Sequence, residues 1–145
     1  MNRQEFYKFV YELKDTDIII CSITASRFLG MIDYIYPKIY VYAKDETILK
    51  KKKIPYTNLI NQIELNFKNI KVINDVKCTS ELQTLIDIAK QLKSDKWLFS
   101  LFYESLKNSY KKISIQDVPK DVIKIFETNI EEIEYEENYM EELYG

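Results

Sequence analysis

The sequence predicts an α/β or α+β fold, in which a small mixed sheet is flanked by helices and the C-terminal half is helical. Short β-branched and aromatic runs at Ile18–Cys21 and Lys38–Ala43 are typical of strands. Apolar residues spaced three and four apart recur after residue 79 and indicate helices. With 145 residues and 46% hydrophobic content, the chain can fill one core. We therefore expect a single globular domain over residues 1–126 and an acidic tail over residues 127–145.

The first thirty residues predict two helices separated by an apolar run. Residues 2–14 show the pattern of an amphipathic helix, in which the inward-facing residues are Phe6, Phe9, Val10 and Leu13. The run that starts at Ile18 is either a buried strand or an extended lead-in. Ser22 or Thr24 is then expected to cap a short helix whose inward residues are Ala25, Phe28 and Leu29. Gly30 ends that helix, because glycine adopts a positive φ without steric penalty.

The middle of the chain predicts strands and turns. Pro37 precedes the Lys38–Ala43 strand, and residues 44–46 form a polar turn. Residues 54–56 are expected to be extended, since proline biases the residue before it that way. Residues 58–67 fit either a helix or a loop followed by a strand, and we favour a strand in the second half. Residues 69–76 indicate a strand and a turn.

Three helices are predicted after residue 79. Ser80 caps the first and forms a capping box with Gln83, and the apolar stripe is Leu82, Leu85, Ile86, Ala89 and Leu92. The second begins at Ser94, and its inward residues are Trp97, Leu98, Leu101, Phe102 and Leu106. After a connector at residues 113–118, Pro119 suits the first turn of a third helix that carries Val122, Ile123 and Phe126. The tail beyond it is either helical or disordered.

Composition argues against an enzyme. The chain has no histidine, so the most common general base and the His-paired nucleophiles are missing. Cys21 and Cys78 are solitary, which disfavours a zinc site, and we interpret both as buried thiols. With Gly30 as the one interior glycine, there is no phosphate-binding glycine loop. We expect no catalytic residue, cofactor or metal, and a cytoplasmic protein without a membrane span, because no apolar run approaches about 18 residues.

Charge is divided along the chain. Residues 1–126 carry 21 basic and 15 acidic groups, whereas residues 127–145 carry eight glutamates and no basic residue. Such an asymmetry suggests a segment that faces a partner. The Lys50–Lys53 run is a solvated loop, a phosphate-contacting patch, or a contact for acidic groups. Tyr34, Tyr36, Tyr40 and Tyr42 share one strand face, either packed in the core or exposed as a binding stripe.

From these groups we select candidate partner-binding residues. They are Lys50, Lys51, Lys52, Lys53, Tyr40, Tyr42, Glu131, Glu132, Glu134, Tyr135, Glu136, Glu137 and Tyr139. A second polar group, Thr79, Ser80, Thr84 and Asp87, is interpreted instead as helix capping and outer-face polarity.

Three stretches in order resemble the effector half of AbiE-type antitoxins from type IV toxin–antitoxin systems. They are TASRFLG at residues 24–30, KIYVYAKDE at 38–46, and KVINDVKCTSELQTLIDIA at 71–89, where Thr79, Ser80, Thr84 and Asp87 carry the family's pattern. The resemblance covers about residues 18–92. It implies a protein partner, a nucleotidyltransferase-like toxin. Members usually begin with a winged-helix DNA-binding domain, and the residues before the match are too few for one, so we do not expect operator binding.

Three functions are consistent with these observations. The first is a non-enzymatic antitoxin-like protein that neutralises its toxin by association. The second is a mobile-element protein, from a phage or plasmid, that inhibits a host nuclease or defence protein through the acidic tail. The third is a nucleic-acid-binding module centred on Lys50–Lys53, whose affinity falls steeply with salt.

Overall fold

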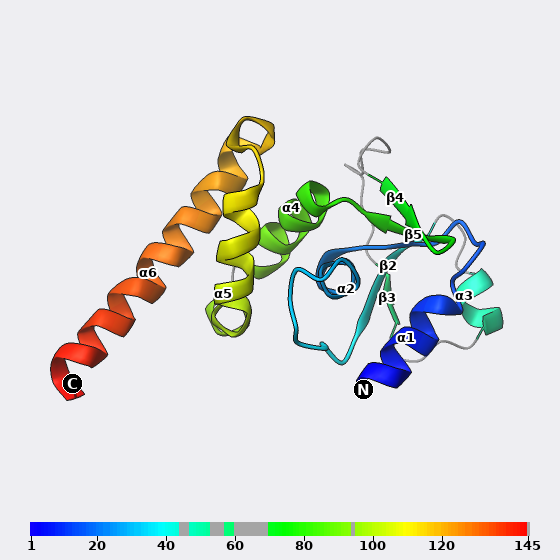
Figure 1. Cartoon of the computed structure of the whole chain (residues 1–145), viewed down its shortest axis with the longest axis horizontal. Coiled ribbons are helices and arrows are strands. Elements are labelled where there is room, and N and C mark those ends of the chain that lie inside the picture. Colours follow the sequence, from blue (N-terminus) through cyan, green and yellow to red (C-terminus); the bar gives the residue numbers. More distant parts are fainter. Residues whose placement is uncertain (44–46, 53–56, 60–69, 94, 145) are drawn as a thin grey trace.

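The computed structural model of the chain describes residues 1–43, 47–52, 57–59, 70–93 and 95–144. It has an α+β fold: a mixed sheet and its helices occupy the first part of the chain, and helices alone the C-terminal part (Figure 1). The expected fold class is confirmed in its α+β form. The predictions for residues 44–46, 54–56 and most of 58–67 lie outside the described residues, as do those for Lys53 and Ser94.

The sheet has five strands in the order β3-β2-β1-β5-β4. The strands are β1 (Ile19–Ile20), β2 (Ile39–Tyr42), β3 (Thr57–Leu59), β4 (Ile70–Ile73) and β5 (Val76–Thr79). Strand β1 runs antiparallel to β2 and parallel to β5, so the short central strand joins the two halves of the sheet. Strands β2 and β3 are parallel, whereas β4 and β5 form an antiparallel hairpin.

The β4–β5 hairpin closes through a two-residue loop. Asn74 and Asp75 have φ values of 50° and 63°. Two consecutive positive φ angles define the type I′ turn, whose twist matches that of antiparallel strands. The strand and the turn predicted for residues 69–76 are present, whereas β5, which follows the turn, was not predicted from the sequence.

The described part of the chain contains six α-helices. They are α1 (Arg3–Tyr11), α2 (Ser22–Phe28), α3 (Thr47–Lys52), α4 (Glu81–Leu92), α5 (Lys96–Lys112) and α6 (Lys120–Tyr144). Asn2 caps α1 with a capping box in which its side chain accepts from the Glu5 N–H. A 3-10 turn at Ile115–Asp117 connects α5 to α6. Gly30 follows α2 with φ 76°, as predicted for a helix-terminating glycine.

Different helices pack on the two faces of the sheet. Side chains alternate along β2, so that Ile39 and Val41 pack with Phe6 and Val10 of α1, while Tyr40 packs on the opposite side. That opposite side is covered by α2 and α4 (Figure 1). The β-branched runs are therefore buried on both faces, which explains why they lack a polar alternation.

Helices α5 and α6 extend the core on the α2 and α4 side of the sheet, and they lead away from the strands. They pack on α4 and on each other around Phe99, Phe102, Leu106 and Phe126, which are all nearly inaccessible to solvent. Phe126 lies between Phe99, at a ring-centroid distance of 5.9 Å, and Tyr110, at 5.1 Å. Figure 1 shows α5 and α6 close at their connector and splayed toward the C-terminus.

Two of the expected inward residues of α5 point to solvent instead. Trp97 is 73% exposed and Leu101 is 42% exposed, whereas Phe99 and Tyr103 are buried. The predicted stripe was rotated around the helix, since α5 carries apolar residues on more than one side. Contact with α4 and α6 selected the face that contains Phe99, Phe102 and Leu106.

The expected cap of α2 is also wrong. The N-cap residue is Cys21, whose side chain makes no capping hydrogen bond. Ser22 has a φ of 54° and donates its hydroxyl to Oε1 of Gln91 on α4, while Thr24 accepts from the backbone N–H of Tyr40 at 2.8 Å. Both hydroxyls therefore attach α2 to its neighbours rather than cap it.

Candidate functional site

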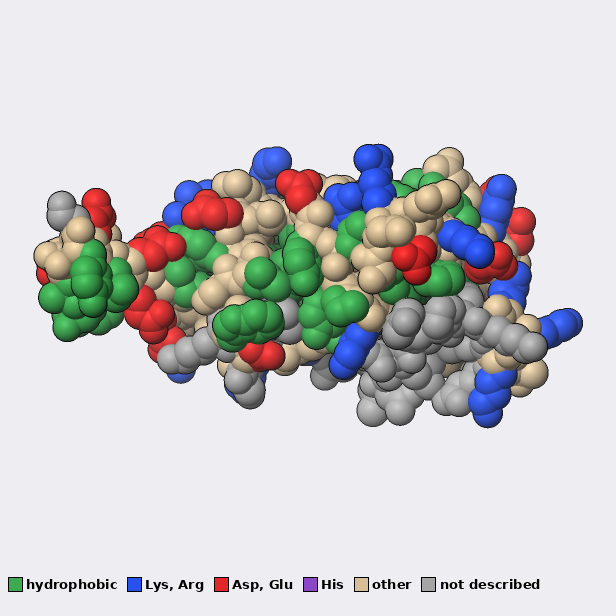
Figure 2. Space-filling view, turned by 90° about the horizontal axis from the view of Figure 1, so that it is seen from below, with side chains coloured by type: hydrophobic (Ala, Val, Ile, Leu, Met, Phe, Trp, Pro, Cys, Tyr) green, Lys and Arg blue, Asp and Glu red, His purple; other side chains and the backbone are tan. Residues whose placement is uncertain are grey.

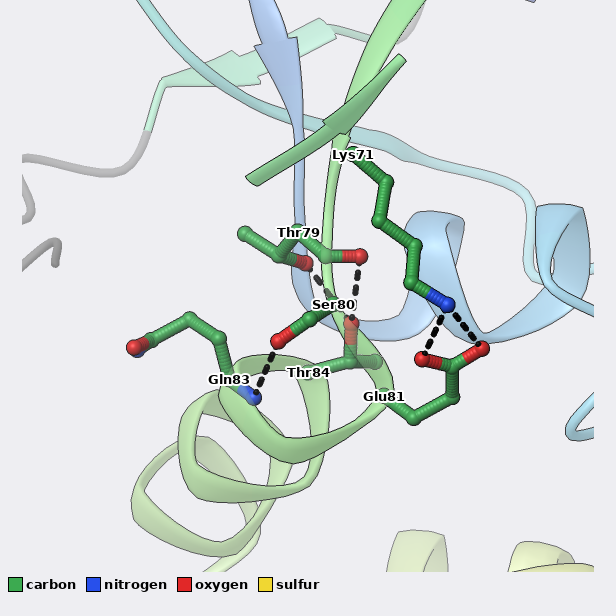
Figure 3. A network of polar contacts seen from close by, with 6 residues as sticks. All are labelled: Lys71, Thr79, Ser80, Glu81, Gln83 and Thr84. Atoms are coloured by element: carbon green, nitrogen blue, oxygen red, sulfur yellow. Dashed lines mark hydrogen bonds and ion pairs between the residues drawn. The ribbon is translucent and has the colours of Figure 1, made fainter. Parts of the chain in front are cut away.

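Three of the four polar residues that carry the resemblance, Thr79, Ser80 and Thr84, lie where β5 turns into α4 (Figure 3). Ser80 is the N-cap and accepts from the Gln83 N–H at 3.2 Å. The hydroxyl oxygens of Thr79 and Thr84 are 2.7 Å apart, and both residues are fully buried. The Thr84 hydroxyl also lies 3.4 Å from the Thr79 carbonyl oxygen, and either hydroxyl can donate in the shorter contact. These hydroxyls fasten the last residue of the sheet to the first turn of α4.

Only half of the predicted capping box forms. The Gln83 side chain does not return to Ser80; its Nε2 donates to Oδ1 of Asp87 at 3.0 Å. Asp87 is 3% exposed, and Thr84 is buried as well, so the expectation that these residues form the outer face of the helix is wrong. On the surface beside them, Lys71 of β4 forms an ion pair with Glu81 at 2.7 Å (Figure 3). Thr79, Ser80, Thr84 and Asp87 are thus engaged in holding the fold.

The two cysteines are buried thiols, as expected. Burial raises the pKa of Cys21 far above its ordinary value, and the nearby Asp87 carboxylate raises it further. Burial also raises the pKa of Cys78, to about 11. Both groups remain protonated at neutral pH, so neither offers the thiolate that a nucleophile or metal ligand requires. In the described ranges, no three Cys, Asp or Glu side chains come together as a metal site.

Several of the predicted partner-binding residues lie far apart. Lys50, Lys51 and Lys52 are exposed on the short helix α3, not in a loop. Tyr40 is 8% exposed and belongs to the core, so it offers no surface for binding, while Tyr42 is half-buried. The four tyrosines do not share one strand face, because Tyr34 and Tyr36 precede β2 and pack against Phe102 of α5.

The acidic segment forms the end of one continuous helix. Helix α6 passes through residue 127 without a break, and Asn129 on it is buried. Beyond Glu134 the helix exposes large apolar side chains, namely Tyr135, Tyr139, Met140, Leu143 and Tyr144. Figure 2 shows hydrophobic side chains gathered at the tip of α6, on the far left, with acidic side chains next to them. Of the two interpretations of the tail, the helical one matches the structure.

A polar contact between α5 and α6 marks where close packing ends. Lys107 Nζ lies 2.9 Å from Glu134 Oε1, and the Tyr103 hydroxyl donates to the same oxygen at 3.0 Å. The hydrogen bonds from Lys107 and Tyr103 lower the pKa of Glu134, and the bond to Glu134 raises the pKa of Lys107. Glu134, one of the predicted partner-binding residues, is thus engaged within the chain.

Next to this contact the two helices enclose an open groove of about 420 Å³. It is lined by Ser100 and Tyr103 of α5 and by Ile133, Glu136, Glu137 and Met140 of α6. Glu136 and Glu137 are among the partner-binding residues predicted from the sequence, whereas the residues of the α5 wall are not. The signal was present in the spacing of Phe99, Phe102, Leu106 and Tyr110, which fits a helix packed with Trp97 outward.

Comparison of the chain with protein-family models, curated proteins and solved structures gives no match. None of the helices described is long and apolar enough to cross a membrane.

Proposed function

We propose that this chain is a non-enzymatic, antitoxin-like protein that neutralises a nucleotidyltransferase-like toxin by direct association. The observation that carries the proposal is the surface of α6 beyond Glu134, where five large apolar side chains are exposed among glutamates. Exposed apolar side chains that are contiguous and surrounded by charge are characteristic of protein interfaces. Tyrosine suits such a surface, because it gives a large contact area at a small entropy cost.

The type of partner comes from the resemblance of residues 18–92 to AbiE-type antitoxins. The polar residues of that resemblance are used for packing, so they support the scaffold and leave the contacts to the exposed surface. On this view α2, β2 and α4 fix the orientation of α5 and α6, and the last helix presents the binding residues.

Co-expression tests the proposal directly. The full chain is produced together with a nucleotidyltransferase-like toxin encoded beside it, and growth and co-purification are measured. We expect growth to be restored and the two proteins to elute as one complex. A toxin that remains fully active and elutes separately would contradict the proposed function. A variant with Tyr139→Ser and Leu143→Ser, both exposed, is expected to weaken the complex while circular dichroism shows an unchanged fold.

A further inference from the structure

The groove between α5 and α6 combines an apolar floor with acidic walls. Tyr103 is 5% exposed at the floor, where Ile133 is half-buried. Ile133, Glu136, Glu137 and Met140 are three and four residues apart, so they share one side of α6. On the opposite wall, Ser100 lies one turn before Tyr103 on the same side of α5.

The charges at this groove are available to a ligand. Glu134 is neutralised by Lys107 at the closed end. Within the described part of the chain, Glu136 and Glu137 form no ion pair. No basic residue follows Lys124, so the C-terminal half of α6 offers negative charge alone. A ligand of opposite charge would gain electrostatic attraction at this site without displacing a lysine.

We infer that the groove receives a basic amphipathic helix of the partner protein, which completes a three-helix bundle with α5 and α6. This inference rests on the proposed function and names the chemistry of the partner. Apolar residues of that helix would cover Ile133 and Met140. Its Lys or Arg side chains would lay their methylene stems along the floor and place their charged heads against Glu136 and Glu137.

A second copy of this chain fits the groove poorly. Two α6 helices side by side would bring the same glutamates together, and like charges repel. The exposed lysines of α3 belong to a six-residue helix and are consecutive, so they spread around its circumference instead of forming one face. A different protein with a longer, basic helix matches both the apolar floor and the acidic walls of the groove.

The test uses the full chain and a fluorescent 18-residue helical peptide made of leucine and arginine. Methionine methyl groups carry carbon-13, since the chain has three methionines and Met140 lines the groove. Met31 is the internal control, because it lies at a different cavity beside Gly30 and Lys112. We expect the Met140 signal, assigned with Met140→Leu, to shift on titration while the Met31 signal stays in place.

Charge variants separate the groove from general attraction to an acidic helix. The double variant Glu136→Gln with Glu137→Gln is expected to weaken peptide binding about tenfold. This corresponds to a loss of about 1.4 kcal/mol of binding free energy, to which the two ion pairs contribute together. The control variant Glu127→Gln with Glu142→Gln removes the same charge from α6. We expect it to change the affinity for the peptide by less than about threefold. Glu127 lies before the groove, and Glu142 is about half a turn around the helix from Ile133.

Each outcome supports or overturns the inference. Equal weakening by the two double variants, or a Met140 signal that does not move, overturns it. A chain that binds the peptide at the groove but fails to neutralise a toxin refutes the proposed function, and shows that the groove binds a basic helix from a partner other than a toxin. Conversely, full neutralisation by the Glu136→Gln and Glu137→Gln variant refutes the groove and leaves the function intact.

Discussion

The hydroxyl pair between β5 and α4 gives the sharpest test of whether the polar motif is structural. Replacing Thr84 with valine keeps the shape of the side chain but removes its oxygen. The Thr79 hydroxyl, fully buried and 2.7 Å from that oxygen, then loses its hydroxyl partner. A buried polar group left without a partner costs about 1–3 kcal/mol. For a chain of this size, 2 kcal/mol corresponds to a fall in Tm of roughly 4–8 °C.

A double-mutant cycle isolates the contact. Thr79→Val with Thr84→Val removes both hydroxyls, so neither hydroxyl is left without the other, and an apolar pair of the same shape can be nearly neutral. We therefore expect the double variant to be more stable than Thr84→Val alone, with a coupling energy of about 1 kcal/mol or more. Urea unfolding followed by far-ultraviolet circular dichroism measures all four proteins.

Two results would refute this reasoning. The first is a Thr84→Val variant within about 0.5 kcal/mol of the natural chain, the range of ordinary surface substitutions. The second is strict additivity of the two changes, since residues in contact are expected to couple. If the motif is structural, toxin neutralisation by Thr84→Val also stays normal below its Tm. Loss of neutralisation in the folded variant would instead give these hydroxyls a direct role.

Three further predictions concern packing, backbone and pH. Phe126→Ala should cost about 3–5 kcal/mol in urea unfolding, because Phe126 is fully buried between two aromatic rings, while exposed Met140→Ala should change little. Gly30→Ala should cost about 1 kcal/mol from its φ of 76° alone, since no described atom beyond its two chain neighbours lies within 4 Å of the added methyl group, and a larger loss of stability would reveal a clash. Glu134→Gln should destabilise the chain at neutral pH. The lowered pKa of Glu134 means that its contribution is present above the unfolded carboxyl pKa and disappears as the pH falls through the folded value. The raised pKa of Lys107 keeps the ion pair charged until the pH rises through the pKa of Lys107 in the folded state. A stability difference between the natural chain and Glu134→Gln that persists at low pH contradicts the ion pair.

Local signals predicted much of the fold. The amphipathic pattern of α1, the N-cap at Ser80 and the helix stop at Gly30 each depend on residues close in sequence. For the same reason the β-branched content of β2 identified that strand. Short-range physics decides these features: backbone geometry, capping hydrogen bonds and the period of apolar residues.

Long-range contacts decided what the sequence left open. Which face of α5 is buried depends on contact with α4 and α6, so Trp97 could not be placed from spacing alone. Ser22 left its expected capping role because Gln91, 69 positions away, accepts its hydroxyl. The groove has the same origin. Its acidic wall is visible in the sequence, but its second wall exists only because α5 and α6 pack together.

The sequence by itself determined that this chain is rich in helix after residue 79, divided in charge and without histidine chemistry. Only the tertiary structure decided that Thr79, Thr84 and Asp87 are buried and that the acidic segment continues α6 as an exposed helix. The physical reason is that burial is a property of pairs of elements. A side chain is inside or outside according to what packs on it, and its partners lie far along the chain.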